Sequence, residues 1–193
     1  MSFYDHPEKF DVGFLAALFA QEDDALRGFD FAPVGTGQVG DSYRVTLDWA
    51  VHHDGLPKSL VAKCPAADAV SRDTARNMNL YEIETKFYEH FGTNCGARVP
   101  HVYLADYQET SGDGILLFED MAPAQQIAQM DGCSVAQVEA VLREAALLHK
   151  SHWNDDALSA HEFLTYGQKE ERRTFVSGLM GAVYPEWRAR YEG

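Results

Sequence analysis

The chain has 193 residues, of which 46% are hydrophobic and 24% charged, and its formal net charge is −14. This length allows one domain, or one and a half, with a sizeable core. The negative charge argues against nucleic acid and anionic membranes as partners, but a nucleotide site needs only local positive potential. No apolar run approaches the roughly 18 residues of a membrane helix. The absence of a secretory signal and the three widely spaced cysteines favour the cytoplasm.

The first elements along the chain are a predicted helix and two predicted strands. Apolar residues at helical spacing indicate a short amphipathic helix over about residues 10–21. Residues 29–34 then predict a strand. Tyr43, Val45 and Leu47 alternate with polar residues, which is typical of a second strand.

Three glycines lie between these two strands, Gly35, Gly37 and Gly40, in the spacing G-x-G-x-x-G. This spacing lets backbone N–H groups approach a phosphate without interference from Cβ atoms. A dinucleotide-binding fingerprint requires a helix directly after the glycines, whereas the alternation here predicts a strand. The pattern therefore favours a kinase-type glycine-rich loop, and a plain tight hairpin is the alternative.

A lysine, Lys63, interrupts the third predicted strand over residues 60–64. It could be an edge-strand lysine that faces solvent, which is common. It could instead lie over nucleotide phosphates, because an antiparallel strand beside the glycine loop would present it there. The order of glycine loop, second strand and Val61-Ala62-Lys63 matches the V-A-I-K arrangement of kinases.

A single amphipathic helix is predicted next, capped by Ser71 or Asp73 and ended by Gly92. Glu84 falls in the middle of its apolar stripe, whereas Glu82 points away. A carboxylate centred on a buried face is costly unless it is paired. We therefore expect an ion pair between Lys63 and Glu84. The alternative is that Glu84 lies at the edge of a partly covered helix.

Two further strands complete the predicted fold class. Residues 102–105 predict a strand with a proline at its start, and residues 115–118 form a continuous apolar run that is typical of a buried strand. Together these elements predict an α+β lobe, with a five-stranded antiparallel sheet and a helix inserted after the third strand.

The rest of the chain is predicted to be helical. Ser134 and Gln137 have the spacing of a capping box at the start of one helix. Residues 155–193 predict one or two more helices, and Pro185 breaks or starts an element. The apolar faces of these helices exceed what the chain can cover, so we expect a homo-oligomer formed through them.

Five segments taken together resemble the aminoglycoside and choline phosphotransferase group, including the CHK kinase-like proteins, of the protein-kinase-like superfamily. They are the glycine loop, the V-A-K strand, Glu84 in E-T-K-F-Y, L-L-F-E-D-M at 116–121 and L-H-K-S-H-W at 148–153. The resemblance runs from about residue 10 to the end. It implies a kinase-like N-terminal lobe over 1–121, followed by a hinge and an incomplete helical C-terminal lobe over 122–193.

The resemblance also implies a nucleotide cleft between the two lobes. Lys63 would hold the α- and β-phosphates, and Glu84 would position Lys63. The other implied nucleotide-binding residues are Gly35, Gly37, Gln38, Val39, Gly40 and Ser42 around the phosphates, and Glu119, Asp120 and Met121 in the hinge beside the adenine. Many relatives have serine and asparagine where this chain has Val39 and Gly40, so backbone N–H groups and Ser42 would make the phosphate contacts.

The function implied by the resemblance is ATP-dependent phosphoryl transfer to a small-molecule hydroxyl compound. The catalytic loop of the family, H-G-D-x-x-x-x-N, and its metal-binding motif have no counterpart at the expected place in this chain. We therefore expect the catalytic aspartate and the Mg²⁺ ligands outside this chain. The alternative is a truncated, non-catalytic kinase-like module that binds a nucleotide or protein partners. A third hypothesis is an acidic α+β domain with a plain hairpin and a structural ion pair.

Overall fold

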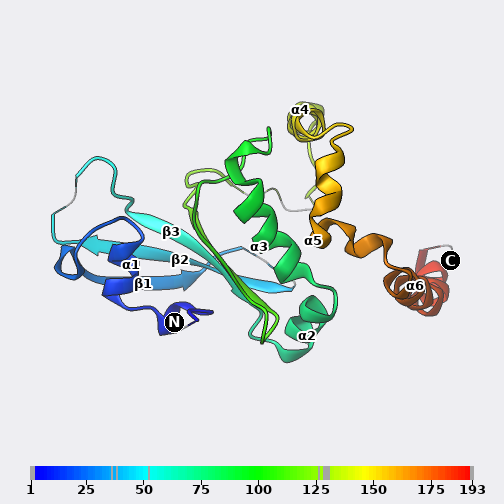
Figure 1. The fold of residues 1–193 in the computed structure, drawn as a ribbon, viewed down its shortest axis with the longest axis horizontal. Helices are drawn as coiled ribbons and strands as arrows, with labels where there is room; N and C mark the ends of the chain where they lie inside the picture. The colour runs from blue at the N-terminus through cyan, green and yellow to red at the C-terminus, as the bar shows by residue number, and fades with distance from the viewer. Residues whose placement is uncertain are drawn as a thin grey trace. The chain divides into compact units, whose positions relative to one another are not determined.

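The structure is a computed structural model that describes residues 3–35, 37, 39–51, 53–125, 127 and 131–191. Internal contacts divide the chain into two units, Met1–Trp153 and Asn154–Gly193. The first unit has an α+β fold with a five-stranded antiparallel sheet and several helices (Figure 1). This confirms the predicted fold class at the level of its sheet and helices.

The strand order of the sheet is β1-β2-β3-β5-β4, and every neighbouring pair is antiparallel. The strands are β1 (Leu26–Pro33), β2 (Gly40–Trp49), β3 (Ser59–Pro65), β4 (Val102–Gln108) and β5 (Asp113–Glu119). Because β3 pairs with both β2 and β5, Lys63 lies on the central strand. The edge-strand interpretation of Lys63 is therefore wrong.

The two faces of the sheet are covered by different elements. Leu60, Ala62 and Cys64 alternate along β3 and are buried in the main hydrophobic core. The same core contains Leu15 of α1 (Val12–Ala17), the short helix within the range predicted as 10–21. Lys63 points to the opposite face, where its side chain meets α3 (Leu80–His90).

The predicted single helix after β3 is in fact two helices, α2 (Ala69–Asn77) and α3. Asp68 caps α2 by accepting a hydrogen bond of 2.8 Å from the Ser71 amide, so neither Ser71 nor Asp73 is the cap. Asn79 separates the helices with a φ of 55°, in the left-handed region that asparagine tolerates better than most residues. The helix ends at His90, two residues before Gly92.

Glu82 is buried, which corrects the prediction that it points away from the protein. Its carboxylate accepts hydrogen bonds from the Lys86 ammonium at 2.6 Å and from the Asn79 side chain at 3.3 Å. α3 contacts both β4 and β5, so more than the apolar stripe of the helix is covered. The buried carboxylate is tolerated because it is paired within its own helix.

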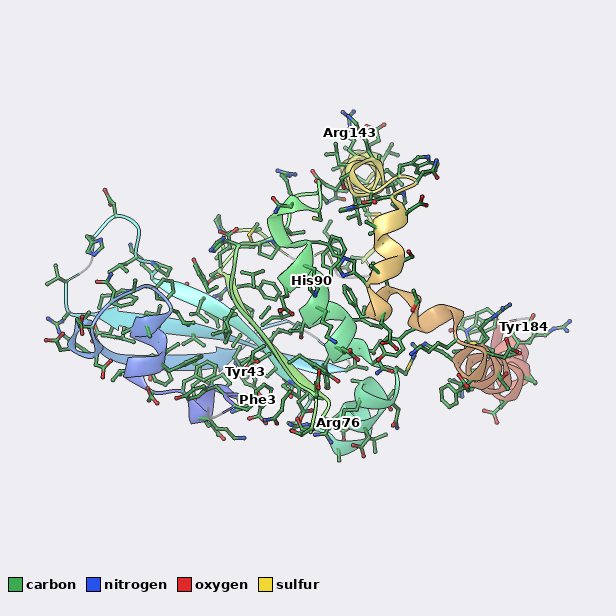
Figure 2. All side chains as sticks on the ribbon, in the orientation of Figure 1. Phe3, Tyr43, Arg76, His90, Arg143 and Tyr184 are labelled. Atoms are coloured by element: carbon green, nitrogen blue, oxygen red, sulfur yellow. The ribbon has the colours of Figure 1, made fainter. Side chains whose placement is uncertain are left out.

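A polar cluster joins α2 to β5. Asp113 is buried, and each of its carboxylate oxygens accepts hydrogen bonds from Arg72 and Arg76, at 2.7 to 3.0 Å. Figure 2 labels Arg76 on α2, the helix that carries both arginines. Burial alone would raise the pKa of Asp113, but the hydrogen bonds from the two arginines lower it to about 2.

α4 (Val135–Ser151) begins with the predicted capping box, in which Ser134 and Gln137 bond to each other's backbone amides. The Ser151 hydroxyl donates to the Cys95 carbonyl at 2.6 Å and so holds the end of α4 to the segment after α3. None of the residues of α4 is buried. The large apolar residues exposed on α4 are Val135, Val138, Val141, Leu142 and Leu147.

The second unit contains α5 (Glu162–Thr165) and α6 (Glu170–Tyr191). Pro185 lies inside α6, so the prediction that it breaks or starts an element is wrong. Its ring nitrogen cannot donate the usual hydrogen bond to Gly181, yet the helix continues. Figure 2 labels Tyr184 on α6, where it is half exposed. The apolar residues exposed on this helix are Phe175, Val176, Leu179, Met180, Val183, Tyr184, Trp187 and Tyr191.

Among the described residues there are also short 3₁₀ segments. They are η1 (Pro7–Lys9), η2 (Asp23–Ala25), η3 (Gly92–Asn94), η5 (Asp156–Ala160) and η6 (Tyr166–Gln168). Cys64 and Cys95 are buried, whereas Cys133 is exposed. Within the described part of the chain, no helix combines the length and apolar character needed to cross a bilayer.

Candidate functional site

The predicted ion pair between Lys63 and Glu84 is present. The Lys63 ammonium donates to both carboxylate oxygens of Glu84, at 2.6 and 2.7 Å. The two side chains are 39% and 36% exposed, so the pair is only partly buried and a solute can reach the ammonium. β3 supplies the lysine from the centre of the sheet, and α3 supplies the glutamate.

Each glycine of the G-x-G-x-x-G motif has a steric reason to be glycine. Gly35 has a φ of 81°, which lies in the left-handed region. A Cβ atom on Gly37 would lie 2.0 Å from the Gly40 carbonyl oxygen. A Cβ atom on Gly40 would lie 3.0 Å from the Cys64 carbonyl oxygen and 3.9 Å from Cε of Lys63. The end of the glycine-rich loop (residues 35–40) therefore lies directly against the stem of Lys63.

The other predicted loop residues have different surroundings. Val39 is 37% exposed. Ser42 is the register partner of Lys63 across the β2–β3 pair, so the two side chains lie on the same face of the sheet. Gln38 lies outside the described residues.

The predicted hinge begins at Glu119, the last residue of β5. The Glu119 amide donates to the His101 carbonyl at 2.8 Å, and Met121 is exposed. The carboxylate of Asp120 accepts from Nε of Arg44 at 2.6 Å and from the Ser59 hydroxyl at 2.7 Å. The Arg44 guanidinium is the main reason that the pKa of Asp120 falls to about 2, against the effect of burial. Asp120 therefore fastens the segment after β5 to β2 and β3.

The position of Glu84 depends on the close packing of α3 on β5. A Cβ atom on Gly114 would lie 2.5 Å from the Thr85 hydroxyl oxygen and 3.3 Å from the Tyr81 Cβ atom. Thr85 is 2% exposed. Gly114 therefore lets the helix approach the strand closely enough for Glu84 to reach Lys63.

Tyr81 is a residue at this site that the sequence prediction does not name, because its ring fits the apolar stripe of the predicted helix and gives no indication of what its hydroxyl binds. Its hydroxyl donates to the Val39 carbonyl at 2.6 Å and accepts from the Ala66 amide at 2.9 Å. The sequence does indicate that Tyr81 lies near Glu84, because residues three apart share a helix face.

The site thus joins an accessible ammonium group, a carboxylate that fixes its position and a glycine-rich backbone segment. Such a set can bind an anionic group of a small molecule, because the ammonium supplies charge and the glycines permit close approach. Among the residues that the structure describes, no group of three or more His, Cys, Asp or Glu side chains could hold a metal ion. Comparison of the chain with protein-family models, curated proteins and solved structures found no match.

Proposed function

We propose that this chain forms the nucleotide-binding part of an ATP-dependent phosphotransferase of the aminoglycoside phosphotransferase and kinase-like family. Its acceptor would be a hydroxyl group of a small molecule. The observation that carries this proposal is the Lys63–Glu84 pair on a central strand and its facing helix, next to the glycine-rich loop. In kinases a β3 lysine pairs with a helix glutamate and contacts the nucleotide phosphates.

The residues present fit a nucleotide in three respects. The Lys63 ammonium is accessible and is held in place by Glu84. Gly40 keeps the loop close to the lysine stem, and Ser42 lies on the same face of the sheet as Lys63. Bound MgATP would supply the phosphoryl group to be transferred. In this proposal Lys63 binds the phosphates, Glu84 orients Lys63, and the segment 119–121 flanks the base.

Titration with MgATP tests the proposal, with wild type compared with Lys63→Ala and Lys169→Ala. Both lysines pair with a glutamate, at 2.6 and 2.7 Å, but the Lys169–Glu162 pair is exposed and belongs to the second unit. We expect saturable binding by wild type and by Lys169→Ala. A charge-assisted contact to the phosphates is worth about 1.5–3 kcal/mol, so Lys63→Ala should bind at least about tenfold more weakly. Equal affinities for the two variants, or no binding by wild type, would contradict the proposal.

The second candidate function is a non-catalytic module that associates with itself or with other proteins. The exposed apolar residues of α4 and α6 favour it, because large exposed apolar patches commonly mark interaction sites. The two candidates differ in whether Lys63 binds a nucleotide. Neither predicts phosphoryl transfer by this chain alone, because the catalytic aspartate is expected outside it. Saturable MgATP binding that depends on Lys63 supports the phosphotransferase part, whereas association through α4 and α6 without MgATP binding supports the module.

A further inference from the structure

The hydroxyl of Tyr81 connects elements that belong to the candidate nucleotide site. It donates its proton to the Val39 carbonyl and accepts the Ala66 amide proton, so both bonds fix its direction. Val39 belongs to the glycine-rich loop, and Ala66 directly follows β3, which carries Lys63. Tyr81 itself belongs to α3, which carries Glu84.

The ring of Tyr81 adds a packing contact at the same place. The side chain is 7% exposed, and a Cβ atom on Gly40 would lie 3.8 Å from its Cε1 atom. The ring therefore packs against the end of the loop while the hydroxyl bonds to its backbone. Burial of a hydroxyl costs little free energy when its hydrogen bonds are made. Removal of the Tyr81 hydroxyl would leave the Val39 carbonyl and the Ala66 amide without this hydrogen-bond partner.

We propose that Tyr81 is a positioning residue that holds the glycine-rich loop against the Lys63–Glu84 pair before a nucleotide binds. This inference rests on the proposed function. A loop that is fixed in advance loses less conformational freedom when the phosphates arrive, and the affinity for them is correspondingly higher. The effect on affinity is confined to the phosphates, because the proposed function places the adenine beside residues 119–121.

The test substitutes Tyr81→Phe, which keeps the ring and removes the hydroxyl. The fold should tolerate this change, because the Asp41 carboxylate still accepts the Ala67 amide at 2.7 Å and joins the start of β2 to the end of β3. Tyr103→Phe is the matched control, since Tyr103 lies on β4 at the far edge of the sheet. Equilibrium binding of MgATP and of adenosine is measured for all three proteins. Amide hydrogen exchange of the ligand-free chains is followed at residues 39–42 and 66.

We expect Tyr81→Phe to bind MgATP about threefold to tenfold more weakly, the effect of one lost hydrogen bond. Its affinity for adenosine should not change, and the amides near Val39 and Ala66 should exchange faster than in Tyr103→Phe. Unchanged MgATP affinity in Tyr81→Phe, or an equal loss for adenosine, would overturn the positioning role while the proposed function stands. If wild type binds no MgATP, the proposed function fails and the inference fails with it.

Discussion

The choice of residue at a position is most restricted where the backbone of one element packs closely against another element. Gly114 is such a position between a strand and a helix, since even a methyl group there would meet Thr85 and Tyr81 on α3. Gly28 on β1 is its opposite, with no atom within 4 Å of the position of an added Cβ. At Gly114 a side chain is excluded by its neighbours, whereas at Gly28 nothing nearby excludes one. Comparing the two positions therefore distinguishes a steric need for glycine from the general disadvantage of glycine in a strand.

Gly114→Ala should destabilise the protein by about 1–3 kcal/mol, because the added methyl group forces α3 away from β5. Gly28→Ala should be neutral or slightly stabilising, because a strand alanine has less conformational freedom to lose on folding. Urea unfolding of both variants measures the difference. Equal unfolding free energies for the two variants would mean that α3 can move away from β5 without loss of stability.

The ionisation of Asp113 makes the stability of the fold depend on pH. Its pKa of about 2 in the folded protein lies below the value of about 3.9 expected when unfolded, so its ionised form stabilises the fold above pH 4. This contribution is lost as the pH falls from about 4 to about 2. Asp113→Asn should therefore be less stable at pH 7, by about 3 kcal/mol, and the difference from wild type should shrink over that range.

Thermal unfolding of wild type and Asp113→Asn between pH 7 and pH 2 measures this difference in stability. Asp73→Asn is the control, because Asp73 is 66% exposed and pairs with the same Arg76 at 3.4 Å. Its stability should stay within about 0.5 kcal/mol of wild type. A pH-independent deficit in Asp113→Asn would assign its effect to packing instead of charge.

The elements differ in how well their sequences predict them. The strands follow from two patterns. Where one face of a strand lies on the core, as in β3, every second residue is buried, whereas β5 is buried on both faces and its sequence is a continuous apolar run. The break between α2 and α3 contains neither proline nor glycine, and Asn79 is the weaker local signal that a helix ends there. The burial of Glu82 depends on β4, which follows it in the chain, and local periodicity carries no information about that contact.

The candidate site was predicted to a similar extent. Lys63 and Glu84 could be paired from the sequence, because a carboxylate on an apolar helix face is costly without a partner and Lys63 interrupts a neighbouring apolar strand. Tyr81 could not be assigned, since its role depends on the bond of its hydroxyl to the Val39 backbone across 42 positions of sequence. Every residue has a backbone carbonyl, so the sequence does not indicate which carbonyl accepts a hydrogen bond from a side chain.

The left-handed residue between α2 and α3 gives a test at the level of the element. Asn79→Ala and Asn79→Gly both lose the bond to Glu82, but only alanine has a Cβ atom at a φ of 55°. Asn79→Ala should therefore be less stable than Asn79→Gly by about 1 kcal/mol, and chemical denaturation of the two variants measures this. Equal stability would show that α2 and α3 can join into one helix.

The whole molecule combines a net charge of −14 with exposed apolar residues on α4 and α6. The apolar surfaces favour association of chains, whereas the shared negative charge opposes it. We expect self-association that strengthens when salt rises from about 0.05 to 0.5 M, because salt screens the repulsion.

Sedimentation velocity over a range of protein and salt concentrations measures this association. Leu142→Lys on α4 and Leu179→Lys on α6 should weaken it. Val70→Lys on α2 should not, because Val70 is an exposed apolar residue outside those two helices. A monomer at every concentration would contradict the expectation.

The cysteines provide a built-in reporter of folding. Cys64 and Cys95 are at most 1% exposed, and burial raises the pKa of the Cys64 thiol to about 12, so it is not a reactive thiolate at neutral pH. Cys133 is exposed. A thiol-reactive dye should therefore label one cysteine per native chain and three after denaturation. The slower labelling of Cys64 on β3 measures openings of the sheet, and that of Cys95 measures openings of the segment after α3, so the two rates of covalent modification report local unfolding at two places in the fold.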